Sequence, residues 1–329
     1  MADARIKRIP VFIKPFRVEP GRRVRLPQDF DSAGTREVSV KEAKELLRFG
    51  VETLADYQTR LAAQDTYGVV MVLQAMDAAG KDGTIRHVMS GVNPQGVQVS
   101  SFKIPSSEDL DHDYLWRYQK RLPERGNIGI FNRSYYEEVL VVRVHPEILA
   151  KQKLPPKLKD RGIWKRRYRE INDWERYLTD QGYRFVKIFL NVGREEQRRR
   201  FLTRIDEADR NWKFSANDAK ERLYWDDYQK AFSEVLSNTS TPWAPWYVIP
   251  ADDKPFARVA AAAVLANTLI EIDPRFPRVS KEAQTALSAA KVELEGQAPK
   301  GVAADPIEAE LAAAAAAPTA KRARKGRKS

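Results

Sequence analysis

A continuous apolar run, Gly68–Gln74, leads directly into a short loop of small residues, and this pair of features constrains the fold most. The run is short and bounded by turn residues, which is typical of a strand covered on both faces of a sheet. Longer helix-like segments separate four further runs of this kind, at residues 97–102, 128–131, 185–192 and 246–249. Strands that alternate with helices predict a parallel sheet in a layered α/β domain.

We expect this domain to occupy residues 35–278, preceded by an arm at residues 1–34. Four prolines stand among basic residues in the arm, which predicts an extended segment rather than a helix. The domain should begin with a long helix over Ser39–Gln64, because apolar positions recur there near the helical period. Ser39 and Glu42, three residues apart, form a predicted capping box at its start.

The segment after Val279 differs in composition from the domain. Residues 279–329 are rich in Ala, Lys and Glu and poor in large apolar side chains. Such a composition cannot offset the entropy cost of ordering. We therefore expect a mostly disordered tail with transient helical structure.

The chain has no cysteine and three histidines, His87, His112 and His145. This excludes disulfides, thiolate metal sites and cysteine nucleophiles, and it leaves little for a zinc site. Catalysis is therefore expected from carboxylates, Lys and Arg. The sequence contains no apolar stretch of about eighteen residues and no apolar signal core at its start, so we expect a cytoplasmic protein without a membrane span.

The net charge of +12 suggests a polyanionic partner. Nucleic acid, an acidic membrane surface and a phosphate-rich small substrate all fit this charge, which alone does not choose among them. Part of the excess lies in the last twelve residues, where six basic residues stand without an acidic one. The remainder belongs to the folded body.

The loop after the first strand has the parts of a phosphate-binding loop. Small residues let consecutive N–H groups curl around phosphate oxygens, a helix N-terminus points at the anion, and a Lys reaches further phosphates. A helix is expected to start at Thr84. The loop parts appear before it, in order, as Ala78, Ala79, Gly80, Lys81 and Gly83.

The match to the usual loop pattern is incomplete at two positions. Ala75 stands where the pattern begins with Gly, and Asp82 follows the Lys where Ser or Thr usually holds magnesium. An ordinary strand-to-helix turn containing Gly therefore stays open as the alternative. Asp77 lies inside the loop, where phosphate would repel its carboxylate unless a cation bridges them or it faces the acceptor. Its alternative role is to stabilise an Asx-type turn.

A second strand end, at Asn132, carries further polar candidates. In P-loop proteins this neighbouring strand delivers the metal-side group, but the Asn132 amide adds no negative charge, so magnesium would depend on Asp77 and the substrate phosphates. Arg133 is expected to point into the same crevice above the strand ends, with a solvated Arg at a helix N-terminus as the alternative. One of Glu137 and Glu138 is a candidate to face the site, although surface positions are the commoner place for glutamate.

A run of arginines follows the strand at residues 185–192. A spacing of four places Arg200 and Arg204 on one helix face, and Arg210 and Lys213 extend the positive charge into a loop. Such a segment can close over phosphates as a lid. The alternative is a solvated helix face paired to nearby glutamates.

Taken together, these segments resemble the polyphosphate kinase 2 family. The resemblance spans about residues 15–272 and rests on four motifs in family order and spacing, at residues 77–83, 131–144, 210–215 and 244–250. Asn132, where many relatives carry Asp, and the Glu pair after two tyrosines make the chain most similar to class III members. Those members are associated with phosphorylating nucleoside monophosphates and diphosphates alike.

The resemblance implies an α/β, P-loop kinase-like three-layer fold with a central parallel sheet, like thymidylate kinase, and a helical lid at about residues 194–222. It implies reversible phosphoryl transfer between inorganic polyphosphate and AMP or ADP, with Mg²⁺ or Mn²⁺ as cofactor. The implied partners are polyphosphate, adenine and also guanine nucleotides, and further copies of the chain in a dimer or tetramer, with nucleic acid not required.

The resemblance also implies roles for single residues. Asp77 would orient or activate the acceptor phosphate through magnesium, and Lys81 and Arg133 would neutralise the polyphosphate. Asn132 would lie beside them, and Glu137 would lie on the nucleotide side. The implied phosphate-binding set is Ala78, Ala79, Gly80, Lys81, Asp82, Gly83, Thr84, Arg133, Arg200, Arg204 and Lys213.

Two other functions stay open at this point. An ATP-dependent nucleotide kinase of the same fold predicts an adenine pocket on the donor side, where a polyphosphate enzyme needs a long channel lined by Lys and Arg. A nucleic-acid-binding protein that uses the basic tail predicts salt-sensitive binding, lost when the segment after Val279 is deleted.

Overall fold

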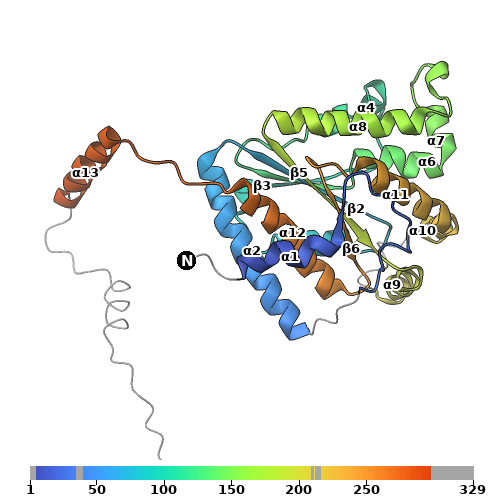
Figure 1. The fold of residues 1–329 in the computed structure, drawn as a ribbon, viewed down its shortest axis with the longest axis horizontal. Coiled ribbons are helices and arrows are strands. Elements are labelled where there is room, and N and C mark those ends of the chain that lie inside the picture. Colours follow the sequence, from blue (N-terminus) through green and yellow to red (C-terminus); the bar gives the residue numbers. More distant parts are fainter. Residues whose placement is uncertain (1–4, 35–39, 209–210, 212–215, 298–329) are drawn as a thin grey trace, which may run out of the picture. The chain divides into compact units, whose positions relative to one another are not determined.

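The structure, a computed structural model, describes residues 5–34, 40–208, 211 and 216–297. The chain divides into two units, Met1–Pro277 and Arg278–Ser329. The first unit contains a sheet with helices on both faces (Figure 1). The predicted layered α/β domain is therefore confirmed.

The sheet has six strands in the order β1-β6-β5-β2-β4-β3. All neighbouring pairs are parallel except β1 with β6, which is antiparallel. The five runs predicted as strands all lie in it. The strands are β1 (Arg17–Val18), β2 (Gly68–Ala75), β3 (Val97–Ser101), β4 (Ile128–Asn132), β5 (Tyr183–Asn191) and β6 (Trp246–Pro250).

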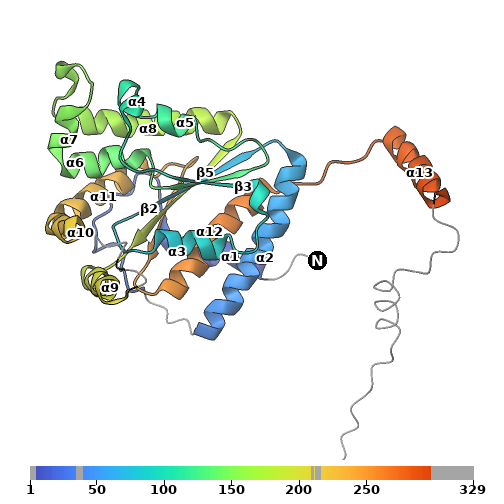
Figure 2. The same ribbon diagram turned by 180° about the vertical axis from the view of Figure 1, so that it is seen from behind.

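One face of the sheet is covered by a layer built around a long alanine-rich helix, α12 (Figure 2). This layer comprises α1 (Ile9–Ile13), α2 (Val40–Gln64), α3 (Lys81–Val88) and α12 (Lys254–Ile272). Gly50 of α2 approaches so closely that a Cβ there would lie 3.2 Å from the Cβ of Ala262. Small side chains thus let α2 pack tightly on α12.

The other face carries a second set of helices (Figure 1). It comprises α4 (Ser107–Asp111), α5 (Trp116–Gln119), α6 (Val141–Val144), α7 (Pro146–Lys151), α8 (Ile163–Asp180) and α11 (Trp225–Thr239). Two helices, α9 (Arg194–Asp206) and α10 (Ala216–Glu221), connect β5 to the short 3₁₀ helix η7 (Arg222–Tyr224). Further 3₁₀ helices span Ile6–Arg8, Lys14–Phe16, Pro94–Gly96, Tyr135–Val139 (η4) and Pro156–Leu158.

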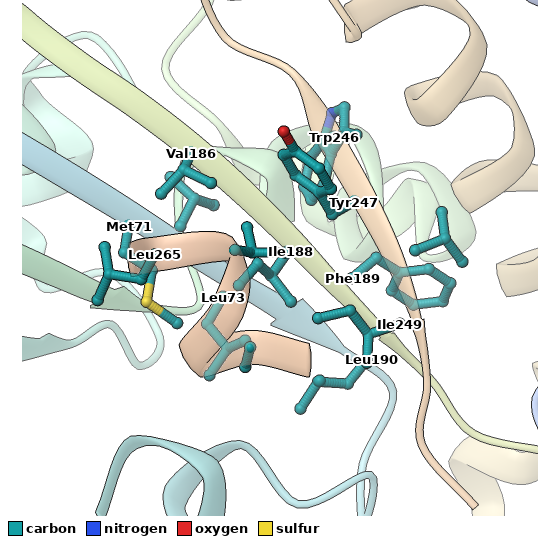
Figure 3. Packing of buried hydrophobic residues seen from close by; sticks show 14 of the residues in the cluster. Met71, Leu73, Val186, Ile188, Phe189, Leu190, Trp246, Tyr247, Ile249 and Leu265 are labelled. Carbon is teal, nitrogen blue, oxygen red and sulfur yellow. The ribbon is translucent and has the colours of Figure 1, made fainter. Parts of the chain in front are cut away.

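The central strands are buried on both faces, which is why they read as continuous apolar runs. Figure 3 shows side chains of β2, β5 and β6 packed against one another and against Leu265 of α12. On the opposite side, the ring of Phe189 stacks on Phe232 of α11 at a centroid distance of 4.1 Å. Met71 and Leu73 are fully buried, and the other side chains of this core are buried as well. Their burial fixes β2 at the centre of the domain.

Among the described helices, α12 alone is long and apolar enough to meet the length and composition criteria for a membrane span. Its window is 67% buried inside the domain, and its residues pack on α2, α3, β5 and β6. We therefore assign it as the core helix of the α/β domain.

The prediction of an extended arm is wrong for residues 6–16, which form three short helices. Pro10 and Pro15 lie in first helical turns, where the missing N–H has no intrahelical partner to lose. Ile9 and Ile13 are buried in the domain core. The segment is thus part of the domain rather than a separate arm.

The long helix predicted from residue 39 is confirmed over Val40–Gln64, with Glu42 in its first turn. The predicted cap, Ser39, lies outside the described residues. In the part of the tail that the structure describes, Lys281–Gly296 form helix α13 in the second unit, where the sequence predicts transient helical structure. Its N-cap is the Ser280 hydroxyl, which accepts from the Ala283 N–H at 3.2 Å. Residues 298–329 lie outside the described part of the chain.

Candidate functional site

The loop between β2 and α3 is coiled tightly at the carboxyl end of the central strand. Ala78 and Gly80 both have left-handed backbone conformations, with φ of 62° and 109°. The helix α3 begins directly at Lys81. A residue other than Gly at position 80 would be strained at that φ. The sequence-predicted loop and helix start are therefore present, with the helix three residues earlier than expected.

The backbone N–H groups at the start of α3 are available to an anion. Thr84 N–H donates to Gly80 O at 2.9 Å and opens the helical ladder. Within the described chain, no hydrogen bond is donated by the four N–H groups from Gly80 to Gly83. Four consecutive free donors at the positive end of a helix dipole form a suitable site for phosphate oxygens.

Lys81 is folded over the loop from its first helical position. Its ammonium donates to the carbonyl of Ala75 at 3.0 Å. Burial lowers the pKa of Lys81, while the carboxylate of Asp77 opposes that shift. The Lys81 ammonium therefore lies at the carboxyl end of β2, beside the free N–H groups.

An ion pair joins this loop to the end of the neighbouring strand. Arg133 Nη2 lies 3.0 Å from Asp77 Oδ1, and Arg133 Nη1 lies 4.0 Å from Glu137 Oε2. Both Arg133 and Asp77 keep more than a third of their side chains exposed. Arg133 also has a left-handed φ of 64° and donates its N–H to Leu73 O at 3.1 Å. The turn after β4 thus directs the guanidinium toward the loop after β2.

Of the two neighbouring glutamates, Glu137 is the one that faces the site. Burial raises the pKa of Glu137, and the Arg133 guanidinium counters this effect. Glu138 faces elsewhere and forms a buried ion pair with Arg167 at 3.2 Å.

Asn132 contacts the first turn of α3 rather than standing free at the strand end. Its side-chain amide donates to Asp82 Oδ1 at 2.8 Å. The parallel register, with Leu73 opposite Asn132, brings these groups together. Asn132 therefore orients the carboxylate that replaces the usual Ser or Thr.

A buried polar cluster anchors the turn that carries Arg133 and Glu137. The carboxylate of Glu175 accepts from the hydroxyls of Tyr135 at 2.6 Å and Tyr136 at 2.9 Å. Lys187 completes the cluster, with its ammonium 2.7 Å from Glu175. Burial lowers the pKa of Lys187 to about 8, and Glu175 opposes the shift. Sequence reasoning missed this cluster, since a Lys within a strand and a Glu within a helix carry no sign of their pairing.

The lid prediction is only partly matched by the described residues. Arg200 was expected to face phosphates, but it is 6% exposed and its guanidinium is bound to backbone carbonyls. The predicted contact of Arg200 with phosphate is therefore wrong, because every N–H of its guanidinium is already bound to a protein acceptor. Arg204 is partly exposed and lies over the ring of Phe201 at 5.5 Å. Arg210 and Lys213 lie outside the described residues.

Two arginines that the sequence reasoning missed lie next to the loop. A Cβ at Gly83 would lie 3.9 Å from Nη2 of Arg258 on α12. Burial lowers the pKa of Arg258, and the Arg86 guanidinium lowers it further. Within the described residues, neither Arg86 nor Arg258 has a hydrogen bond or an ion pair with a carboxylate. Two neighbouring like charges without counter-charge favour an anionic ligand.

The carboxylates of Asp77 in the loop and Asp82 in the first turn of α3 fit a divalent cation shared with a substrate. The described residues contain no group of three or more acidic, His or Cys side chains that could hold a metal by themselves. Asp77 and Asp82 each use Oδ1 in a contact with a neighbouring side chain. Magnesium commonly binds to one or two carboxylates together with substrate phosphates, and this arrangement matches that donor set.

Comparisons with known proteins show which family and which relatives this chain is similar to. The family described as Polyphosphate kinase 2 (PPK2) matches residues 37–276. An "ADP-polyphosphate phosphotransferase" of Rhodopseudomonas palustris is 50% identical over 268 residues, covering 81% of this chain and 93% of the relative. An "AMP/ADP-polyphosphate phosphotransferase" of Meiothermus ruber is 41% identical over 267 residues, covering 81% and 96%.

A solved structure shares the fold. The crystal structure of polyphosphate kinase 2 from Arthrobacter aurescens TC1 aligns with a TM-score of 0.71 at 36% identity. The alignment covers 83% of this chain and 99% of that one. The predicted P-loop kinase-like fold is thereby confirmed.

Proposed function

Because the chain belongs to the polyphosphate kinase 2 family, we propose that it transfers a phosphoryl group reversibly between inorganic polyphosphate and AMP or ADP. The observation that carries the proposal is the row of free N–H groups from Gly80 to Gly83, flanked by Lys81 and by the Arg133–Asp77 pair. This arrangement binds phosphates and neutralises their charge at the end of a central strand.

The donor side of the site favours polyphosphate. Arg86 and Arg258 present two cations without a carboxylate partner among the described residues, next to the N-terminus of α3. A polyphosphate chain carries about one negative charge per phosphate, so it can occupy the loop and the two arginines together. An ATP donor would instead require an apolar slot for adenine there.

The acceptor side is proposed to lie at Asp77, Arg133 and Glu137. Asp77, with Asp82 close by, would hold Mg²⁺ or Mn²⁺ together with substrate phosphates. The bound ion would neutralise charge on the transferring group. Arg133 would neutralise the phosphate that passes from the polyphosphate to the nucleotide, and Glu137 contacts that guanidinium from the other side.

The chemistry needs positioning more than a strong base. The attacking oxygen of AMP or ADP is already largely ionised at neutral pH, so no side chain has to remove its proton. Catalysis then comes from in-line alignment and from charge neutralisation by Lys81 and Arg133. One phosphoanhydride replaces another, so the reaction should run in both directions.

The deciding experiment supplies the full chain with AMP, magnesium and polyphosphate and no nucleotide donor. We expect ADP to form first and ATP afterwards, and K81M to abolish both. Lys165→Met, at an exposed position on α8, is the matched control and should retain activity. Product formation that requires ATP as donor would instead support an ATP-dependent kinase.

We further propose that the enzyme is cytoplasmic and homo-oligomeric and that nucleic acid is dispensable. Deleting residues 298–329 should leave polyphosphate-dependent activity intact. If the protein instead binds nucleic acid through its basic tail, the same deletion should abolish that binding. Light scattering on the purified chain tests for a dimer or tetramer. Supplying GMP or GDP in place of AMP or ADP tests guanine nucleotides as acceptors.

A further inference from the structure

The helix α9 lies behind the phosphate-binding loop and holds its carbonyl oxygens. Arg200 and Gln197 of this helix are 6% and 2% exposed. We infer that both are positioning residues that set the direction of the loop N–H groups, an inference that rests on the proposed function. For Arg200, this role takes the place of the predicted direct contact with phosphate from a lid.

All five N–H donors of the Arg200 guanidinium are in use. Nη1 donates to the carbonyls of Ala78 at 3.1 Å and Ala79 at 2.8 Å. Nη2 donates to the carbonyls of Ala251 at 2.6 Å and Asp252 at 2.9 Å. Nε donates to Glu196 Oε1 at 2.7 Å. One side chain therefore joins the phosphate-binding loop to the segment after β6 and keeps no donor for a phosphate.

Gln197 extends the same support by one residue. Its side-chain N–H donates to the carbonyl of Asp77 at 2.9 Å. The carbonyls of three consecutive residues, Asp77, Ala78 and Ala79, are thus held from α9.

Holding these carbonyls orients the N–H groups that follow them. In a trans peptide, the C=O and the next N–H point in opposite directions, and none of these peptides is cis. The N–H groups of Ala78, Ala79 and Gly80 must therefore point away from α9. Ala79 N–H closes a turn on Met76 O at 3.3 Å, and Gly80 N–H opens the free row that ends at Gly83.

A contact from η7 fixes Gln197 in turn. Arg222 Nη1 donates to Gln197 Oε1 at 2.7 Å and to Arg194 O at 3.0 Å. The side-chain amide of Gln197 is therefore bound at both ends, which fixes its rotation. This connects the segment after α10 to the carbonyl of Asp77 through a single side chain.

Three variants of the full chain test the inference. R200K keeps the charge but cannot reproduce the planar fork, and we expect kcat/KM for polyphosphate to fall about 100-fold. Q197M removes one donor without removing a charge, and we expect a loss of about tenfold. In both R200K and Q197M, the KM for AMP should stay within about twofold of the wild-type value. Arg198→Met, an exposed neighbour on the same helix, is the matched control and should behave as the wild type.

A binding measurement separates this inference from the proposed function. Tripolyphosphate affinity, measured by calorimetry without nucleotide, should weaken at least about tenfold in R200K and Q197M. If the wild type binds tripolyphosphate but makes no product from polyphosphate, the proposed function is wrong. The positioning role is then still tested by comparing the tripolyphosphate affinities of the wild type, R200K and Q197M. Absence of binding by the wild type would overturn the positioning role.

Other outcomes identify a merely structural role. If R200K and Q197M melt at lower temperature but, when folded, keep wild-type kcat/KM and affinity, the inference is wrong. If R200K does not fold, Q197M decides the matter alone. R222M leaves the hydrogen bond from Gln197 to the Asp77 carbonyl in place, so its kcat/KM for polyphosphate should fall less than that of Q197M. An equal fall in R222M would show that Gln197 does not act through this hydrogen bond.

Discussion

The guanidinium of Arg133 lies 3.0 Å from the carboxylate of Asp77, so one ion pair bridges the ends of two neighbouring strands. The two residues are 56 positions apart in the chain. Both are partly exposed, and each would face a charge of the substrate: phosphate for Arg133, a phosphate-bound cation for Asp77. The pair therefore holds both groups in place before substrate arrives.

Removing either member of this pair should slow the reaction strongly. We expect D77N and R133M each to lower kcat about 100-fold or more, because each removes a charge aimed at the reacting phosphates. The double variant should lose less than the product of the single effects, since the two act as a unit. Initial rates at saturating AMP and polyphosphate measure this. Asp111→Asn, in an exposed ion pair with Lys153, is the control and should keep wild-type kcat.

Arg258 and Arg86 should affect the polyphosphate side selectively. We expect R258M and R86M to raise the KM for long-chain polyphosphate about tenfold, as for the loss of one charged contact. The KM for AMP should not change, and the salt dependence of the polyphosphate KM should weaken. Arg169→Met, an exposed arginine of α8, serves as the control. An unchanged polyphosphate KM in both variants would remove these arginines from the donor path.

The alkaline limb of the pH profile should report Lys81. In the free enzyme, burial lowers the pKa of the Lys81 ammonium from its usual value of 10.5. As the pH rises, the lysine therefore loses its positive charge before pH 10.5 is reached. The value of kcat/KM, which reports groups of the free enzyme, should therefore decline with a midpoint below 10.5. K81R stays charged throughout this range and should be slower but lack the decline. The same decline in K81R would assign it to another group.

The buried cluster beneath the Arg133 turn should matter for stability. Lys187 and Glu175 are fully buried, so K187M leaves an unpaired carboxylate in the core and should cost about 3–5 kcal/mol of unfolding free energy. Urea denaturation measures this loss. K187M/E175Q should recover part of it because no charge remains buried. Lys230→Met, at an exposed position of α11, should change stability little.

The sheet and the loop could be predicted from the sequence because their signals are local. Strand β2 is buried on both faces, so its run of apolar residues has no polar interruption until Gln74. The loop needs small residues and a Lys at fixed offsets, and these stand next to one another in the chain.

The role of Arg200 could not be predicted because its helix is charged on every side. Gln197, Arg200 and Phe201 are the buried residues of α9, and among them Phe201 alone is apolar. An arginine that binds carbonyls and one that faces solvent have the same sequence pattern. The distinction depends on the loop after β6, whose carbonyls lie 51 and 52 residues further along the chain.

The N-terminal helices could not be predicted for a different reason, and the stability of α13 is not visible in its composition. Pro10 and Pro15 predict a break in helical structure, yet proline is favoured in a first turn, which is where both residues lie. In α13, Ser280 caps a run of good helix formers. Local capping favours a helix there even though no side chain of α13 is buried.

The antiparallel pairing of β1 with β6 has a practical consequence for shortened versions of the protein. The two residues Arg17 and Val18 cover the outer edge of β6, whose five residues are all buried. Removing the first eighteen residues would expose a row of unpaired N–H and C=O groups on an apolar strand, which can recruit the same edge of another molecule. The association state of this enzyme should therefore be measured with its N-terminus intact, because a truncated protein could assemble through a contact that the native fold prevents.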